Sequence, residues 1–228
     1  MDKNIKEFQE LHALFKNNGF KLYLVGGTVR DYLLGLSLND MDAVTDATPE
    51  DMKEFLPDAN YTFARFGSIS FKTQKKVKFD ITTMREETSY NDSRHPEEIK
   101  FVKDLNIDVK RRDFTVNALY LDENLKVIDL ANGVSDLNKK VLRMIGEPEK
   151  RLKEDPLRIF RAIRFAADYG FKIDEELDKA IMKCSELVNN LNIEKIKMDL
   201  GKSKPSSKEI VLQYLEKYHI KLNENVIE

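Results

Sequence analysis

One stretch, residues 21–42, restricts the fold more than any other part of the chain. Residues 22–25 form a short apolar run that is typical of a buried strand, and the run stops at Gly26 and Gly27. A helical pattern comes next, and residues 40–45 predict a second strand. A strand, a glycine turn, a helix and a second strand in this order predict an α/β domain.

The same stretch contains charges that suit a nucleotide. Asp40 and Asp42 are two residues apart in a predicted strand, so both side chains leave one face. Two carboxylates so close repel each other unless a cation lies between them, and their hard oxygen atoms favour Mg²⁺. The diglycine lets backbone N–H groups of Gly27 approach phosphate oxygens, and Arg30 can pair with the same phosphates. A solvated acidic strand end and a plain tight turn are the alternatives.

A third carboxylate belongs to a later predicted strand, residues 76–82. Its apolar residues Val77, Phe79 and Ile81 alternate with polar ones, which puts Asp80 on the opposite face. If this strand lies beside residues 40–45, three carboxylates converge. Such a triad suits a two-metal phosphoryl or nucleotidyl transfer.

Arginines recur at two further places. Arg111 and Arg112 stand at the start of a predicted helix within residues 107–120 and offer planar, always-charged donors for phosphate or ribose. A second helix, predicted over residues 150–168, carries a basic stripe beside an apolar one. The basic stripe contains Arg158, Arg161 and Arg164. A solvated basic turn and a solvated amphipathic face are the alternative interpretations.

The order of the predicted elements divides the chain. Strands and helices alternate up to about residue 140, and helical patterns then follow one another over 150–168, 174–190, 193–200 and 207–218. We therefore predict a domain of residues 1–140 with a small sheet and a helical domain of residues 141–228.

Local signals mark several boundaries. Thr28 is expected to cap the helix after the diglycine, and residues 48–51 form a capping-box start with Pro at the first helical position. The polar segment 84–96 predicts an exposed, mobile loop. Residues 121 and 127–130 predict a hairpin.

Composition limits the compartment and the partners. The 228 residues carry a net charge of −2, which by itself gives no argument for nucleic-acid binding. The single cysteine, Cys184, excludes an internal disulfide, is expected to be buried, and fits a reducing cytosol. No apolar run approaches the roughly 20 residues that span a bilayer, so we expect a cytoplasmic protein without a membrane partner.

Five motifs occur in a fixed order: Val25–Asp31 with Asp40 and Asp42, residues 111–119, residues 133–137, and residues 154–158. Together with the loop segment 90–96, they resemble the bacterial class II tRNA nucleotidyltransferases, the CCA-adding enzymes, and the similar bacterial poly(A) polymerases. The resemblance covers residues 20–200. It implies a polymerase-beta-type nucleotidyltransferase head with a small mixed sheet, an α/β (α+β) fold, followed by an all-helical neck and a partial body.

The resemblance also implies roles for individual residues. Asp40 and Asp42 match the Mg²⁺ ligands, and Asp80 matches the third catalytic carboxylate. Gly27, Arg30 and Arg112 match positions that hold the triphosphate. The neck positions match residues near the nucleotide: Asp155, Arg158, Arg161 and Arg164.

The neck pair Asp155 and Arg158 hydrogen-bonds the incoming base in that family. A fixed carboxylate–guanidinium pair can select C and A, because both bases carry an amino group where U and G carry a carbonyl. The resemblance therefore implies addition of CCA to the 3′ end of tRNA from CTP and ATP, with release of pyrophosphate.

Two features leave alternatives open. The family continues into body and tail domains that grip the tRNA, whereas this sequence ends at Glu228. A catalytically silent RNA-binding remnant is therefore one alternative. Enzymes that add CC, A or poly(A) share the motifs and are the others. Asp92, Arg94 and His95 in the predicted loop favour CCA or A addition over CC alone.

Overall fold

The computed structural model describes residues 3–39, 41–87 and 99–222. The described chain divides into two compact units. The first holds most of the chain up to Val134, and the second holds the chain from Ser135 together with Asp113–Thr115. The boundary therefore falls inside the Arg111–Arg112–Asp113 motif.

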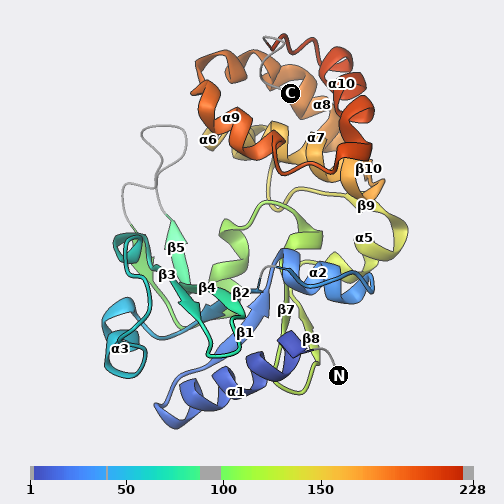
Figure 1. Cartoon of the computed structure of the whole chain (residues 1–228). Helices are drawn as coiled ribbons and strands as arrows, with labels where there is room; N and C mark the ends of the chain where they lie inside the picture. Colours follow the sequence, from blue (N-terminus) through green and yellow to red (C-terminus); the bar gives the residue numbers. More distant parts are fainter. Residues whose placement is uncertain (1–2, 40, 88–98, 223–228) are drawn as a thin grey trace. The chain divides into compact units, whose positions relative to one another are not determined.

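A six-stranded mixed sheet forms the centre of the first unit (Figure 1). Its strand order is β3-β4-β2-β1-β7-β8, and β2 pairs with β4 in parallel while the other neighbours are antiparallel. The strands are β1 (Leu22–Val25), β2 (Met41–Thr45), β3 (Ser68–Lys72), β4 (Lys78–Thr83), β7 (Leu119–Leu121) and β8 (Val127–Asp129). The predicted small mixed sheet is thus confirmed, as is the hairpin of β7 and β8.

Short helices connect and cover these strands. They are α1 (Lys3–Asn17), α2 (Gly27–Leu33), α3 (Pro49–Phe55) and α4 (Leu105–Asp108). In Figure 1, α1 crosses below the strands, and its buried face includes Phe8 and Phe15. The predicted capping box begins α3, because the Thr48 hydroxyl accepts from the Asp51 backbone N–H and the Asp51 carboxylate accepts from the Thr48 backbone N–H.

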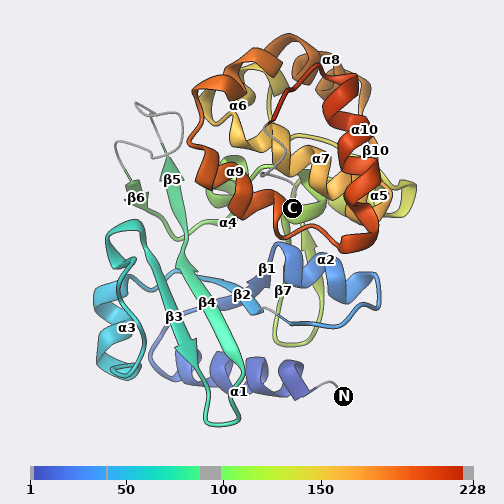
Figure 2. The same cartoon turned by 45° about the horizontal axis from the view of Figure 1, so that its top comes forward.

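The segment predicted as a loop over 84–96 begins as ordered structure instead. Met84 is buried, and β5 (Arg85–Glu87) pairs with β6 (Ile99–Phe101) in an antiparallel ribbon beside α4 (Figure 2). The sequence analysis did not predict β5, because its residues are charged and its partner strand comes more than ten residues later. Asp92, Arg94 and His95 lie outside the described residues.

The helix predicted within 107–120 is wrong from Arg111 onward. Two single 3₁₀ turns, Val109–Arg111 and Thr115–Asn117, flank an extended Arg112, and β7 follows. Every residue from Asp113 to Leu121 is buried. A segment buried on all sides has no polar face, so periodicity could not separate a helix from extended chain.

The second unit is mainly helical, with α7 (Leu157–Tyr169) at its centre (Figure 2). Around it lie α6 (Pro148–Glu154), α8 (Glu175–Cys184), α9 (Ile193–Leu200) and α10 (Lys208–Lys217). The helix α5 (Gly133–Lys139) begins at the boundary of the units. The unit also contains one parallel pair of short strands, β9 (Val141–Leu142) and β10 (Lys172–Ile173), which the sequence analysis did not predict.

The helix predicted over 150–168 is in fact two helices. Asp155 is extended and ends α6, and Pro156 precedes α7. The break follows from Pro156, which disfavours helical backbone at the residue before it. Gly170 ends α7 in the left-handed conformation with φ 65°. Cys184 is buried, as predicted.

Within the described residues, every helix is too short or too polar to cross a bilayer.

Candidate functional site

Two of the three predicted carboxylates lie side by side in the sheet. Asp42 of β2 and Asp80 of β4 are register partners in the parallel pair, and both leave the same face. Asp80 also accepts a hydrogen bond from Lys78 Nζ at 2.8 Å, and both of these side chains are about half exposed. Asp40, the third member, lies outside the described residues. Within the described residues, no group of three or more His, Cys, Asp or Glu side chains forms a metal site.

The glycine turn lies directly against Asp42. A Cβ built on Gly26 would be 3.9 Å from the Asp42 Oδ2, and Gly26 adopts φ 68°, which favours glycine. The Thr28 hydroxyl accepts from the Asp42 backbone N–H at 2.8 Å. The prediction that Thr28 caps α2 is therefore wrong. Gly26 takes the cap position, and the Thr28 hydroxyl instead connects the turn to β2.

Arg30 is buried next to this turn. A Cβ on Gly27 would meet the Arg30 Nη2 at 3.4 Å, so the guanidinium lies close to the glycine backbone. Arg30 Nη1 donates to Asn117 Oδ1 at 2.6 Å, and Nε donates to Asp31 Oδ1 at 2.9 Å. The structure therefore brings Gly27, Arg30 and Asp42 together, and it fixes Arg30 through two partners.

A row of side chains extends from the carboxylates across the sheet. Asp80 of β4 is opposite Asp42 of β2. The register between β1 and β2, continued by one residue, places Val25 of β1 opposite Asp42 on its other side. Val25 is in turn opposite Tyr120 of β7. Directly opposed residues share a face. Tyr120 therefore lies on the carboxylate face, two strands from Asp42, which is about 10 Å at the usual strand spacing.

Arg112 lies over Tyr120, with its guanidinium carbon 5.0 Å from the ring centroid. Its Nε and Nη2 donate to Asp108 Oδ2 at 3.1 and 2.8 Å. Burial raises the pKa of the Asp108 carboxyl, but the guanidiniums of Arg112 and Arg111 outweigh burial and hold the pKa well below its usual range. The structure thus confines Arg112 to the carboxylate face of the sheet.

The predicted base-selecting pair lies at the break between α6 and α7. Asp155 Oδ1 accepts from the Leu157 backbone N–H at 3.1 Å, at the start of α7. Arg158 is buried, and its Nη1 donates to the Arg151 carbonyl at 2.6 Å and lies 3.4 Å from Glu154 Oε2. Both residues are therefore held by the ends of the two helices, which fixes their orientation within the second unit.

The other two neck arginines pair with carboxylates in the second unit. Arg161 Nε donates to Asp113 Oδ2 at 2.8 Å, and Arg161 Nη2 donates to the same oxygen. Burial alone would raise the pKa of the Asp113 carboxyl, but the Arg161 guanidinium outweighs burial and holds the pKa below its usual value. The pair is therefore ionised. Arg164 is 8% exposed, and its Nε and Nη2 each donate to a carboxylate oxygen of Asp199 of α9 at 3.3 Å. The two residues therefore form a buried ion pair, and Arg164 is not part of a solvated basic stripe.

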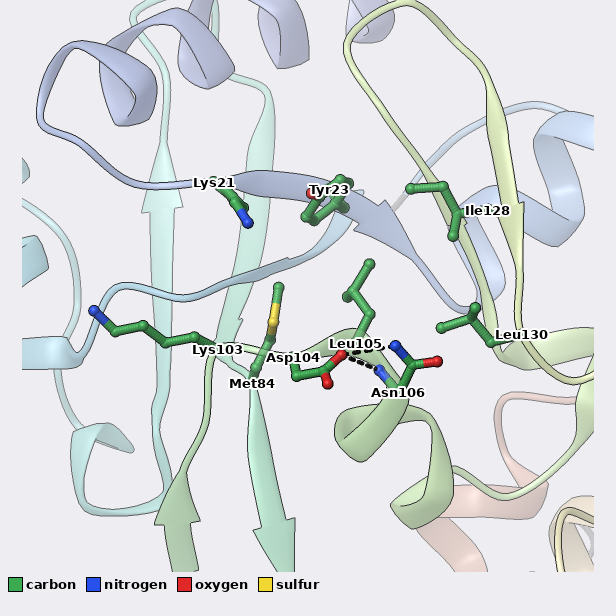
Figure 3. Close-up of a pocket in the computed structure, with 9 residues that line it drawn as sticks. All are labelled: Lys21, Tyr23, Met84, Lys103, Asp104, Leu105, Asn106, Ile128 and Leu130. Carbon is green, nitrogen blue, oxygen red and sulfur yellow. Dashed lines mark hydrogen bonds between the residues drawn. The ribbon is translucent and has the colours of Figure 1, made fainter.

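A hollow of about 200 Å³ opens on the first unit, near the start of β1 (Figure 3). It includes Tyr23, which shares the carboxylate face of the sheet through its register with Val44. Asp104 accepts two hydrogen bonds from Asn106 at 2.8 Å, drawn as dashed lines in Figure 3. The hollow is lined by Lys21, Tyr23, Met84, Lys103, Asp104, Leu105, Asn106, Ile128 and Leu130. None of the residues predicted for the site lines it.

Sequence reasoning missed the residues that hold the arginines. Asn117 orients Arg30, Asp113 orients Arg161, and Asp108 orients Arg112. Asn117 and Asp113 belong to the motif at residues 111–119, so their presence there was a usable signal. Asp108 precedes Arg111 and Arg112 by three and four residues, which was a local signal. Its bonds to the Arg85 backbone and to Tyr120 had no such signal, because they form only when β5 and β7 pack beside α4.

A mixed sheet with two register-paired aspartates beside a diglycine turn is the arrangement that the resemblance to a nucleotidyltransferase head implies. The family described as poly A polymerase head domain matches residues 22–143, and this chain belongs to that family.

Known relatives agree with this assignment. A CCA-adding enzyme of Lactobacillus helveticus (strain DPC 4571) is 40% identical over 201 residues, which cover 88% of this chain and 50% of the relative. The crystal structure of the Bacillus stearothermophilus CCA-adding enzyme in complex with CTP is 31% identical, has a TM-score of 0.86, and covers 97% of this chain and 54% of that chain. A tRNA-processing enzyme (apo form I) is 30% identical with a TM-score of 0.76, covering 100% of this chain and 62% of that one. The chain thus spans about half the length of the Lactobacillus helveticus and Bacillus stearothermophilus enzymes.

Proposed function

We propose that this chain is an Mg²⁺-dependent nucleotidyltransferase that adds C and A residues to the 3′ end of tRNA from CTP and ATP. The observation that carries the proposal is the register pairing of Asp42 with Asp80 beside the Gly26 turn. A CCA-adding relative at 40% identity and a solved relative that holds CTP support the substrate class.

The donor set fits a divalent ion. Asp42 and Asp80 present carboxylate oxygens on one face, and Asp40 precedes the same strand. Mg²⁺ takes one or two carboxylates and completes its shell with phosphate and water, so these residues would hold it. When bound, Mg²⁺ lowers the pKa of an attacking hydroxyl and neutralises charge on the phosphates.

The chain's own residues bind and orient the nucleotide in this proposal. The Gly26–Gly27 turn, Arg30 and Arg112 bind the triphosphate. The terminal 3′-hydroxyl of the RNA forms a new bond to the α-phosphorus, the bond from that phosphorus to the bridging oxygen breaks, and pyrophosphate leaves with the electron pair. The hydroxyl proton passes to a base in the surrounding solvent or site. In-line geometry requires that the triphosphate be held rigidly, and the fixed Arg30 meets this need.

Asp155 and Arg158 are proposed to select the base. The carboxylate accepts from the exocyclic amino group shared by C and A, and the guanidinium donates to ring nitrogen or carbonyl atoms. Their anchoring by the ends of α6 and α7 supports this role, since selection requires a fixed donor–acceptor pattern. Arg161 and Arg164 are proposed to lie near the nucleotide as supports of α7.

We assign this reaction to the cytoplasm. The one cysteine of the chain, Cys184, is buried and unpaired, as is common in a reducing compartment.

One assay tests the proposed function. A tRNA transcript that ends at its discriminator base is incubated with Mg²⁺ and each NTP alone, then with CTP and ATP together, and the products are sized on a gel. Addition of two C residues followed by one A is expected. A long A tract would identify a poly(A) polymerase, and addition of only CC or only A would identify a specialist. No incorporation from any NTP would favour a silent RNA-binding remnant.

A further inference from the structure

We propose that Asp108 is a positioning residue that fixes Arg112 for recognition of the triphosphate. The inference rests on the proposed function, and it adds a residue that neither the motifs nor the comparisons assign to the site. The argument depends only on contacts within the first unit.

Asp108 is completely buried and accepts five hydrogen bonds. Its Oδ1 accepts from Arg111 Nε at 2.7 Å and from the Arg85 backbone N–H at 3.3 Å. Its Oδ2 accepts from Arg112 Nε and Nη2, and from the Tyr120 hydroxyl at 3.0 Å. One carboxylate therefore connects β5, the 3₁₀ turn after α4, and β7.

These contacts leave Arg112 little orientational freedom. Asp108 Oδ2 holds one edge of the guanidinium at two nitrogens, and Tyr120 supports its face while its hydroxyl lies 3.0 Å from Arg112 Nε. An arginine side chain otherwise loses rotamer freedom when it is ordered on a ligand. Asp108 and Tyr120 impose that order before the nucleotide arrives, which is the general advantage of a preorganised site.

The charge of the cluster suits an anion. Glu87 Oε1 accepts from Arg85 Nε at 2.8 Å and lies 3.6 Å from Arg111 Nη1. Among the described residues of the cluster, Arg85, Arg111 and Arg112 contribute three positive charges, and Asp108 and Glu87 contribute two negative charges, so the positive charges outnumber the negative ones. Asp108 thus holds the guanidiniums together without cancelling their excess positive charge.

The position of the cluster connects it to the catalytic face. Arg112 lies over Tyr120, and Tyr120 is in the same cross-strand row as Asp42 and Asp80. Two strand spacings, about 10 Å, separate Tyr120 from Asp42. An extended triphosphate anchored at the carboxylates can therefore reach toward Arg112 along one face of the sheet.

The test compares the affinities of CTP and CMP for the whole chain, measured by calorimetry with Mg²⁺ and without RNA. If Asp108 positions Arg112 for the triphosphate, Asp108→Asn should weaken CTP binding by at least tenfold and leave CMP binding unchanged. The ratio of the two Kd values should therefore collapse. A merely structural role would weaken both ligands in the same proportion, or neither, and either result would overturn the inference.

Two further variants complete the design. Glu7→Gln is the matched control, because Glu7 is also a buried carboxylate of the first unit paired with a cation, Lys75, and it should leave the ratio unchanged. Tyr120→Phe keeps the charges of Asp108 and Arg112 and removes the hydroxyl that bonds both of them. It therefore tests the positioning of Arg112 if Asp108→Asn does not fold. A Tyr120→Phe chain whose CTP-to-CMP ratio equals that of the wild type would then count against the inference. Wild-type protein that binds no CTP would instead contradict the proposed function.

Discussion

Among single residues, Asp42 is the one whose substitution we expect to reduce activity most, because it lies opposite Asp80 in the β2–β4 pair and against Gly26. Asp42→Asn keeps the size of the side chain and removes its charge. We expect incorporation of CTP to fall by at least a hundredfold, with a thermal midpoint equal to that of the wild type when both are measured in EDTA. The exposed Asp58 supplies the control, since Asp58→Asn should retain wild-type turnover. Near-normal incorporation by Asp42→Asn would remove Asp42 from the metal site.

The depressed pKa of Asp108 makes a second residue-scale prediction, about acid stability. Because the folded pKa lies below the value of about 4 for an unfolded carboxyl, the folded state binds fewer protons there, and acid favours unfolding. The stabilisation by the ionised carboxylate is fully present above pH 4 and is lost as the pH falls below it.

Urea unfolding at several pH values measures this effect. The difference in free energy of unfolding between wild type and Asp108→Asn should be constant from pH 7 to about pH 4.5 and should shrink between pH 4 and pH 2.5. A difference that grew as the pH fell would show that Asp108 is not ionised in the folded state.

At the scale of elements, α7 and α9 are joined by the buried pair of Arg164 and Asp199. Asp199→Ala leaves a buried guanidinium without this partner, so we expect a loss of about 3–5 kcal/mol in the free energy of unfolding. The double variant Arg164→Met with Asp199→Leu should recover much of that loss. If the double variant also bound CTP normally, Arg164 would be a support of α7 and not a ligand of the nucleotide.

The helices and strands differ in how well they can be predicted from the sequence. The α3 capping box and the β7–β8 hairpin depend on residues close together in the chain, and both were predicted. The segment 111–120 was predicted as helix, yet it is buried from Asp113 onward and contains only single turns and a strand. The β5–β6 ribbon was also missed, since its pairing joins strands across a polar insertion.

The candidate site follows the same division. Asp42, Asp80, Gly27 and Arg30 were predicted from alternation and motif order, and the structure places them together in the first unit. Sequence reasoning did not assign the residues that orient the arginines, although Asn117 and Asp113 belong to the motif at residues 111–119. The hydrogen bond between Asp108 and Tyr120 could not be deduced, because it depends on the packing of α4 against β7.

At the scale of the whole molecule, the proposed functions are divided between the two units. Arg158→Ala in the second unit should broaden base choice, so that UTP and GTP are incorporated at more than one tenth of the CTP rate. The binding of Mg²⁺ by the first unit should be unchanged in that variant. Separate incorporation assays with the four NTPs measure the first quantity, and titration with Mn²⁺ as a spectroscopic probe measures the second. A preserved preference for C and A would exclude Arg158 from base selection.

The parallel pairing of β2 with β4 has a further consequence, for the thermodynamics of the chain. Asp42 and Asp80 belong to strands that α3 and β3 separate in sequence, so the unfolded chain does not hold the two carboxylates as neighbours. An ion that binds both residues binds the folded state alone and must raise its stability by RT ln(1 + [ion]/Kd). Calorimetry should therefore show a melting midpoint that rises with Mg²⁺ concentration and returns to its lower value with EDTA, while Asp42→Asn should melt at one temperature throughout. Metal availability would then govern how long the protein persists in its folded form as well as how fast it reacts.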